Sequence, residues 1–193
     1  SMFAYGYGTA ITHRCLYQGM DPLGIAQYLT RLGLTLGDQA EVQFAKKAWL
    51  EQPQWQELRR LVEDTWVVKD WFELFVAQNV VIDSLVSGLA YTEVDQALNE
   101  RAGSTVSLLT RFQTEWFADS SKWVDACMKV AAAENPANKA LLQQWLGHWR
   151  GRALAALQPV AKQALGADAD DALARVSARL DARLAKAGLL SSN

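Results

Sequence analysis

The stretch from Gln54 to Val86 contains neither proline nor glycine, and this feature most constrains what the chain can fold into. A helix over it would run about nine turns at 3.6 residues per turn. One apolar seam follows the helical repeat and consists of Leu58, Val62, Val68, Phe72, Phe75, Ile82 and Val86. Further apolar residues fall on other sides, namely Trp66, Trp71, Leu74 and Val81. A helix that is apolar on several sides must be enclosed on several sides, so the stretch predicts a central bundle helix or one shared with another subunit.

The remaining sequence also predicts helices. Four prolines leave long proline-free stretches, as helices require, and no strand signal or internal repeat is present. The expected helices are Phe3–Leu36 (a hairpin arm, or one helix bent at Asp21–Pro22), Gln39–Leu50, Tyr91–Ala102, Ser104 or Thr105 to about Ala133, Asn135–Pro136 to about Leu165, and one from Asp168 over Leu173, Val176, Leu180 and Leu184. The predicted fold class is all-α.

The helix after Gly103 shows a heptad-like apolar seam. Its members are Leu109, Phe112, Trp116, Trp123, Ala126 and Val130. Asp119 falls on this seam between two tryptophans. Because an unpaired buried charge is costly, Asp119 is either paired within the seam or carried to its edge by the rotation of the helix.

Composition excludes several classes of protein. The 193 residues carry a formal net charge of −2, so no basic excess favours nucleic acid. Cys15 and Cys127 cannot form a disulfide framework and indicate a reducing, cytoplasmic setting. The apolar stretch Trp66–Val86 could span a bilayer by length, but it carries Lys69, Asp70, Glu73 and Asp83. Each would cost roughly 2.5–3.5 kcal/mol near the centre of a membrane helix. Residues 1–16 show no secretory signal, and we expect a cytoplasmic protein with no membrane or nucleic-acid partner.

Long helices raise the hypothesis of a carboxylate-bridged di-iron site. Such a site needs Glu-x-x-His on two helices and a further Glu on each of two others. The two histidines are His13 and His148, and the residues three positions before them are Ala10 and Trp145. The sequence therefore predicts no metal ligands in this chain. Glu115 and Asp119, one turn apart, are expected to be a solvated or salt-bridged pair.

No catalytic or cofactor-binding residue is expected either. There is no Gly-x-Ser-x-Gly motif, and Cys127 is expected to be a buried, unreactive thiol. Tyr5-Gly6-Tyr7-Gly8 lacks the strand and the Gly-Lys-Ser/Thr of a phosphate-binding loop, so its small residues are expected to let two helices approach closely.

Three blocks resemble a known family. They are Tyr5-Gly-Tyr-Gly-Thr-Ala-Ile-Thr-His13 with its continuation Met20-Asp-Pro-Leu-Gly-Ile-Ala-Gln-Tyr-Leu29, then Val62-Glu-Asp-Thr-Trp-Val-Val-Lys-Asp-Trp-Phe-Glu-Leu-Phe-Val-Ala-Gln-Asn79, and Trp116-Phe-Ala-Asp-Ser-Ser-Lys-Trp-Val-Asp-Ala126. All three resemble the beta-type hydroxylase subunit of bacterial multicomponent phenol hydroxylases, within the phenol, toluene and methane monooxygenases. The part after about Glu134 resembles the family only in being helical.

This resemblance implies a ferritin-like long-helix bundle without iron ligands. Residues 1–193 would form one domain, with 1–134 as the family bundle core and 135–193 as a C-terminal helical extension. The implied partners are a di-iron alpha subunit, a small gamma subunit, a regulatory protein and a reductase, in a dimer of heterotrimers. The implied reaction is NAD(P)H-dependent insertion of one oxygen atom of O₂ into an aromatic ring, with the beta subunit bracing the alpha subunit.

Family members are longer at the N-terminus, so the resemblance implies a shortened chain and a bundle that is incomplete there. A helix that lacks a neighbour leaves an apolar face bare, so such a chain would need a partner or self-association to cover it.

The eight tryptophans favour a chain that buries surface against partners. The packing or subunit-interface candidates are Trp66, Trp71, Phe72, Phe75, Trp116, Asp119 and Trp123. Two other functions stay open: a helical module that binds small molecules, such as the effector domain of a repressor, and a standalone ferritin-like oxidase.

Overall fold

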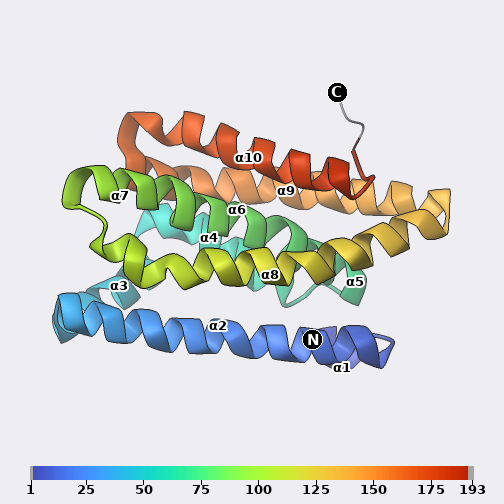
Figure 1. Ribbon diagram of the computed structural model, residues 1–193, viewed down its shortest axis with the longest axis horizontal. Helices are drawn as coiled ribbons and strands as arrows, with labels where there is room; N and C mark the ends of the chain where they lie inside the picture. The colour runs from blue at the N-terminus through green and yellow to red at the C-terminus, as the bar shows by residue number, and fades with distance from the viewer. Residues whose placement is uncertain (1, 191–193) are drawn as a thin grey trace.

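The computed structural model describes residues 2–190, which form long packed helices with no strand in that range (Figure 1). The α-helices are α1 (Met2–Tyr5), α2 (Thr9–Leu36), α3 (Gln39–Glu51), α4 (Pro53–Thr65), α5 (Trp71–Phe75), α6 (Asp83–Gly88), α7 (Asp95–Ala102), α8 (Thr105–Glu134), α9 (Pro136–Leu165) and α10 (Ala169–Lys186). Two π-helical segments, η1 (Val76–Ile82) and η2 (Leu89–Val94), and one 3₁₀ turn, η3 (Gly166–Asp168), complete the fold.

The central helix differs from the one expected over Gln54–Val86. The chain leaves the helix after Thr65 and starts again at Trp71, and from there α5, η1, α6, η2 and α7 run on as one helical element to Ala102. The carboxylate of Asp70 starts it by accepting hydrogen bonds from the backbone N–H groups of Phe72 (2.8 Å) and Glu73 (3.2 Å). Gly103, with a φ of 81°, ends it, as expected. We call this element the central helix.

The central helix is enclosed on several sides, which confirms the interpretation of its apolar pattern. Phe75, Val76, Ala77 and Val81 have no exposed surface. Its segments pack against α8, α9 and α10. By length and composition the helix could cross a membrane, but more than half of its most apolar window, 56%, is buried inside this protein.

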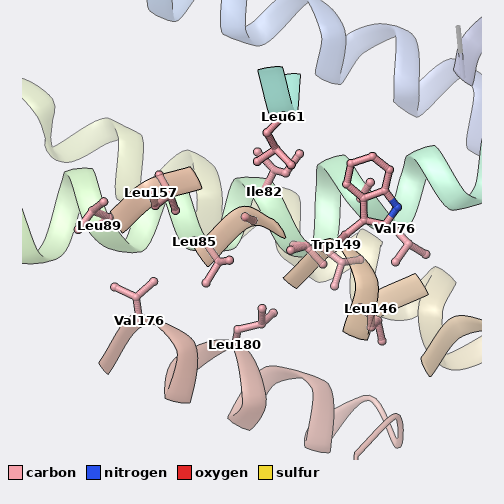
Figure 2. Packing of buried hydrophobic residues seen from close by; sticks show 14 of the residues in the cluster. Leu61, Val76, Ile82, Leu85, Leu89, Leu146, Trp149, Leu157, Val176 and Leu180 are labelled. Atoms are coloured by element: carbon pink, nitrogen blue, oxygen red, sulfur yellow. The ribbon is translucent and has the colours of Figure 1, made fainter. Parts of the chain in front are cut away.

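The last two long helices complete the core. α9 packs against α4, α8, α10 and η1, and its Leu146, Trp149 and Leu157 are buried (Figure 2). Figure 2 also shows Val176 and Leu180 of α10 facing the same cluster. The residues expected to face inward on α10, Leu173, Val176, Leu180 and Leu184, are all buried.

α1 and α2 form the outermost layer, along the lower edge of Figure 1 beside α8. α2 continues through Pro22, so no new helix that Asp21 would cap begins there. Of its 28 residues only Cys15 is buried, so this long helix contributes little to the core.

Candidate subunit interface

The inner face of α2 is attached to α8 by polar and aromatic contacts. Tyr28 Oη donates a hydrogen bond to the carbonyl oxygen of Leu109 (2.9 Å), and the Tyr28 ring meets Phe112 edge-on at 4.8 Å. One to two turns away, Trp116 Nε1 donates to Asp21 Oδ2 (2.8 Å). Cys15, on an adjoining side of α2, joins the hydrophobic core. The expected apolar seam of α8 therefore faces α2 at Phe112 and Trp116.

The outer face of α2 carries a second apolar stripe. Leu16, Met20, Leu23 and Leu34 recur at helical spacing, on the side opposite Ile11, Ile25 and Leu29. They are 39%, 59%, 67% and 46% exposed. Gln27 and Thr30 separate Leu34 from the other three on this side. Exposed apolar residues gathered on one helix face are typical of a surface that another protein covers. We call these four residues the α2 stripe.

The glycines of the Tyr5–Gly8 motif serve the turn between α1 and α2. A Cβ at Gly6 would lie 2.6 Å from the carbonyl oxygen of Met2 and 3.2 Å from the ring of Trp71, so no side chain fits. Gly8 has a φ of 86°, which L-residues with a side chain rarely adopt. The expectation that small residues allow a close approach is confirmed at Gly6.

Four of the seven packing candidates form one continuous aromatic cluster. Trp71 meets Phe72 edge-on at 5.2 Å, Phe72 stacks on Phe75 at 5.4 Å, and Phe75 meets Trp123 of α8 at 5.4 Å. Phe75 is fully buried inside this chain, so it offers no surface to a partner. Trp71, Phe72 and Trp123 are half-buried, and the cluster ties the start of the central helix to α8.

The other three candidates lie apart from this cluster. Trp66 is 75% exposed in the connection between α4 and α5, beside the equally exposed Val67. Trp116 contacts α2 as described. Asp119 has a side chain that is 76% exposed, and it pairs with Lys122 at 2.6 Å. Of the two alternatives for Asp119, the structure supports the one in which rotation of the helix carries it to the edge.

The rotation of α8 also displaces the expected seam. Ala126 and Val130, expected to face inward, are exposed, whereas Thr110, Gln113, Val124 and Met128 are buried. The face of α8 toward the central helix thus contains two polar residues, which an apolar periodicity cannot reveal.

A buried guanidinium that the sequence analysis missed joins α10 to the central helix and α8. Arg183 has a side chain only 12% exposed, and its Nε donates to Asp125 Oδ1 at 2.7 Å. Its Nη1 donates to Ser84 Oγ at 2.6 Å, and its guanidinium lies 5.7 Å from the Phe117 ring centre. In the sequence Arg183 looks like a residue placed for the helix dipole, so its partners could not be foreseen.

Two carboxyl groups of the central helix have shifted pKa values. Burial raises the pKa of Asp83 to about 6, against the lowering effects of the hydrogen bond from Gln78 and of nearby Arg183. For Glu93, burial acts upward, but hydrogen bonds from Arg175 and Arg179 outweigh it and hold the pKa below its usual value. Both Arg–Glu93 contacts are 2.6 Å long.

The described residues do not fit a metal centre. Within residues 2–190, no three His, Cys, Asp or Glu side chains lie close enough together to hold an ion. His13 and His148 are exposed, and His148 packs edge-on to Trp149 at 5.4 Å. Glu115 pairs with Arg111 at 3.2 Å, which agrees with the expected salt-bridged pair.

The two thiols are poor nucleophiles at neutral pH. Burial, together with nearby Cys127, raises the pKa of Cys15 to about 11, and burial also raises the pKa of Cys127. Cys15 is buried, whereas Cys127, expected to be buried, is half-buried. A thiolate is the reactive form, so the raised pKa values make both thiols weak nucleophiles.

Comparison with known proteins places these features in a family. The family model described as Methane/Phenol/Alkene Hydroxylase matches residues 1–135. The oxygenase component DmpL of phenol 2-monooxygenase from Pseudomonas sp. (strain CF600) is 46% identical over 183 residues, which is 94% of this chain and 54% of that protein. The hydroxylase component subunit beta of the toluene-4-monooxygenase system from Ectopseudomonas mendocina is 30% identical over 149 residues, 74% of this chain and 44% of that protein.

A solved structure shows the same architecture. A chain of xenon-pressurized phenol hydroxylase from Pseudomonas sp. OX1 superposes with a TM-score of 0.88 at 40% identity, covering 94% of this chain and 55% of that one. This confirms the all-α, ferritin-like long-helix bundle. The chain spans about half the length of the relatives it matches.

The similarity also continues past the family bundle core. The 183 residues aligned with DmpL exceed the 135 of the family match, so they include much of α9 and α10. The expectation that the part after Glu134 shares only helicity with the family is wrong.

Proposed function

The chain belongs to the Methane/Phenol/Alkene Hydroxylase family, and from this we propose that it is the non-catalytic beta-type subunit of a multicomponent aromatic monooxygenase of the phenol type. The names of two relatives support this, one being an oxygenase component of phenol 2-monooxygenase and the other a hydroxylase subunit beta. In this proposal residues 1–193 act as one cytoplasmic domain that braces its partner during ring hydroxylation.

The proposed partners follow from the family resemblance. The di-iron centre lies in a homologous alpha subunit, a small gamma subunit completes the heterotrimer, and two heterotrimers form the hydroxylase. A reductase delivers electrons from NAD(P)H, and a small regulatory protein adjusts turnover. Residues 2–190 supply no ligand set of their own, and no step of the oxygen chemistry is assigned to them.

The α2 stripe is the observation that carries the bracing role. α2 is held to α8 by its inner face, so its outer face presents Leu16, Met20, Leu23 and Leu34 in a fixed orientation. Fully burying one such side chain contributes roughly 1.5–3 kcal/mol. We propose that the alpha subunit covers this stripe.

Co-expression with a candidate alpha subunit tests the proposal. Leu16→Glu and Leu23→Glu place a charge on the stripe and should reduce the recovered complex at least tenfold in size-exclusion chromatography. Leu98→Glu on α7 is the matched control, because Leu98 is 38% exposed and Leu16 is 39% exposed. Equal loss with Leu98→Glu, or full assembly with both stripe variants, would refute this role for the stripe.

Iron analysis separates the proposal from a standalone oxidase. We expect iron in the purified complex and none above background in the isolated chain. Two irons per isolated chain, with oxygen consumption by it, would support the oxidase instead.

A further inference from the structure

A hollow of about 440 Å³ opens between α4, α6, η2 and α9, and no residue of α2 lines it. The residues that line it are Trp55, Leu58, Val86, Leu89, Ala90, Val94, Leu157, Val160, Gln163 and Ala164. All of them are apolar except Gln163. A concave, largely apolar site of a few hundred Å³ with few polar groups is the usual form of a small-molecule pocket.

The floor and one wall of the hollow are fixed by packing. Leu58, Leu89 and Leu157 at its floor are buried, and Figure 2 shows Leu89 and Leu157 near one another in the core. The Trp55 ring is held by Trp49, with the ring centres 6.2 Å apart. A hollow with such fixed surroundings is already formed before any ligand arrives.

A π-helical segment forms a further wall. Leu89, Ala90 and Val94 all belong to η2, where the helix is wider than an α-helix. π-helical turns cost stability and occur frequently at functional sites, so this wall is a second observation that favours a binding role.

We propose that this hollow binds a small apolar molecule, such as a one- or two-ring aromatic compound with at most one hydrogen-bonding group. The chemistry follows from the lining: no charged side chain contributes to it, and its side-chain hydrogen-bonding groups are the amide of Gln163 and the indole N–H of Trp55. The size follows from α9, where the lining residues run from Leu157 to Ala164, about 11 Å at 1.5 Å per residue. That length suits such a molecule and is short for a docked partner helix of three turns, roughly 16 Å.

One neighbouring hollow has a different, charged character. It lies between η2, α7 and α10 and is lined by Glu93, Glu100, Asp168, Asp171 and Arg175 among others, which disfavours apolar ligands. Binding in this hollow needs no other subunit. A failure to bind would therefore leave the subunit role intact, and a failure of the subunit role would leave the binding intact.

The test is a titration of the 193-residue chain with 4-fluorotoluene, followed by ¹⁹F NMR. We expect saturable binding to the wild type. Ala164→Leu should weaken it at least tenfold, because the added methyl groups occupy the hollow. Ala155→Leu is the matched control on the same helix, at an exposed position outside the hollow, and it should bind as the wild type does.

Thermal unfolding provides a second measurement, the change in unfolding temperature that the ligand causes in each variant. Because each variant is compared with itself, a folding defect alone does not produce such a change. 4-Fluorotoluene should raise the unfolding temperature of the wild type and of Ala155→Leu, and should leave that of Ala164→Leu unchanged. Absence of saturable binding to the wild type, or equal binding by both variants, would overturn the proposal.

Discussion

The central helix and α2 are both long and both apolar on more than one side, yet they lie in opposite settings. The central helix, Trp71–Ala102, is surrounded by α8, α9 and α10, and several of its residues have no exposed surface. α2 is covered on one face only, and Cys15 is its single buried residue. An apolar pattern on several sides therefore predicts that a helix needs several neighbours. The pattern does not distinguish neighbours from the same chain from those of a partner subunit.

The same contrast separates two kinds of stability. Residues on the central helix should determine whether this chain folds. Residues on the α2 stripe should determine what it assembles with and should matter little for folding.

Truncation of Phe75 should give the largest effect. Phe75→Ala removes a fully buried ring and should lower the free energy of unfolding by about 3–5 kcal/mol, whereas Leu23→Ala on the stripe should change it by about 0.5 kcal/mol or less. Urea unfolding followed by circular dichroism measures both. Similar decreases in the free energy of unfolding for the two variants would contradict the proposed difference between the central helix and α2. Trp66→Ala, which would cost as much if Trp66 were enclosed, should be mild because that ring is 75% exposed.

Removal of the buried guanidinium should come next. Arg183→Leu leaves Asp125 and Ser84 without their donor and should cost about 3 kcal/mol in the same assay. Arg179→Leu is the control, because Arg179 is half-exposed and Glu93 keeps Arg175 as a partner. A loss for Arg179→Leu as large as for Arg183→Leu would show that burial of the network does not matter.

Asp83 should make stability depend on pH in a defined window. Its pKa is raised from 3.8 to about 6, so the folded chain holds this proton more tightly than the unfolded chain does. The contribution of Asp83 to stability is therefore present below about pH 4 and is lost as the pH rises to about 6. Asp83→Asn should be more stable than the wild type at pH 8, by on the order of 2 kcal/mol, with the difference vanishing near pH 4. A difference that does not vary with pH would contradict the raised pKa.

The smallest effect should come from the attachment of α2. Trp116→Phe removes the hydrogen bond to Asp21 and should cost about 1 kcal/mol or less in global stability. Amide hydrogen exchange should show the loss locally, as faster exchange in α2 with unchanged exchange in the central helix. Uniformly faster exchange would mean that α2 and the core unfold as one unit.

Much of the fold could be predicted because local signals act at the helix ends. Gly103 ends the central helix, Asn135 and Pro136 start α9, and the four residues predicted to face inward on α10 are all buried. The break after Thr65 was missed although its signal is present: Asp70 followed by Glu73 is the pattern of a helix start, and the carboxylate of Asp70 does cap α5.

The site was less predictable because it depends on contacts between distant segments. Proline removes one hydrogen bond, yet α2 continues through Pro22, and its contacts with α8 lie on both sides of that residue, at Asp21 and Tyr28. The rotation of α8 buries polar residues such as Gln113, which an apolar count assigns to the surface. The stripe has no compositional signal, because Leu16 and Leu23 are ordinary apolar residues and only the fold shows that their side of α2 is uncovered.

Hydrogen–deuterium exchange of this chain, alone and bound to a candidate alpha subunit, tests the bracing role most directly. The account predicts that amides from Leu16 to Leu34 exchange at least tenfold more slowly in the complex, while those of Phe75 to Leu85 are unchanged. A stable complex in which α2 exchanges as it does in the isolated chain would contradict it.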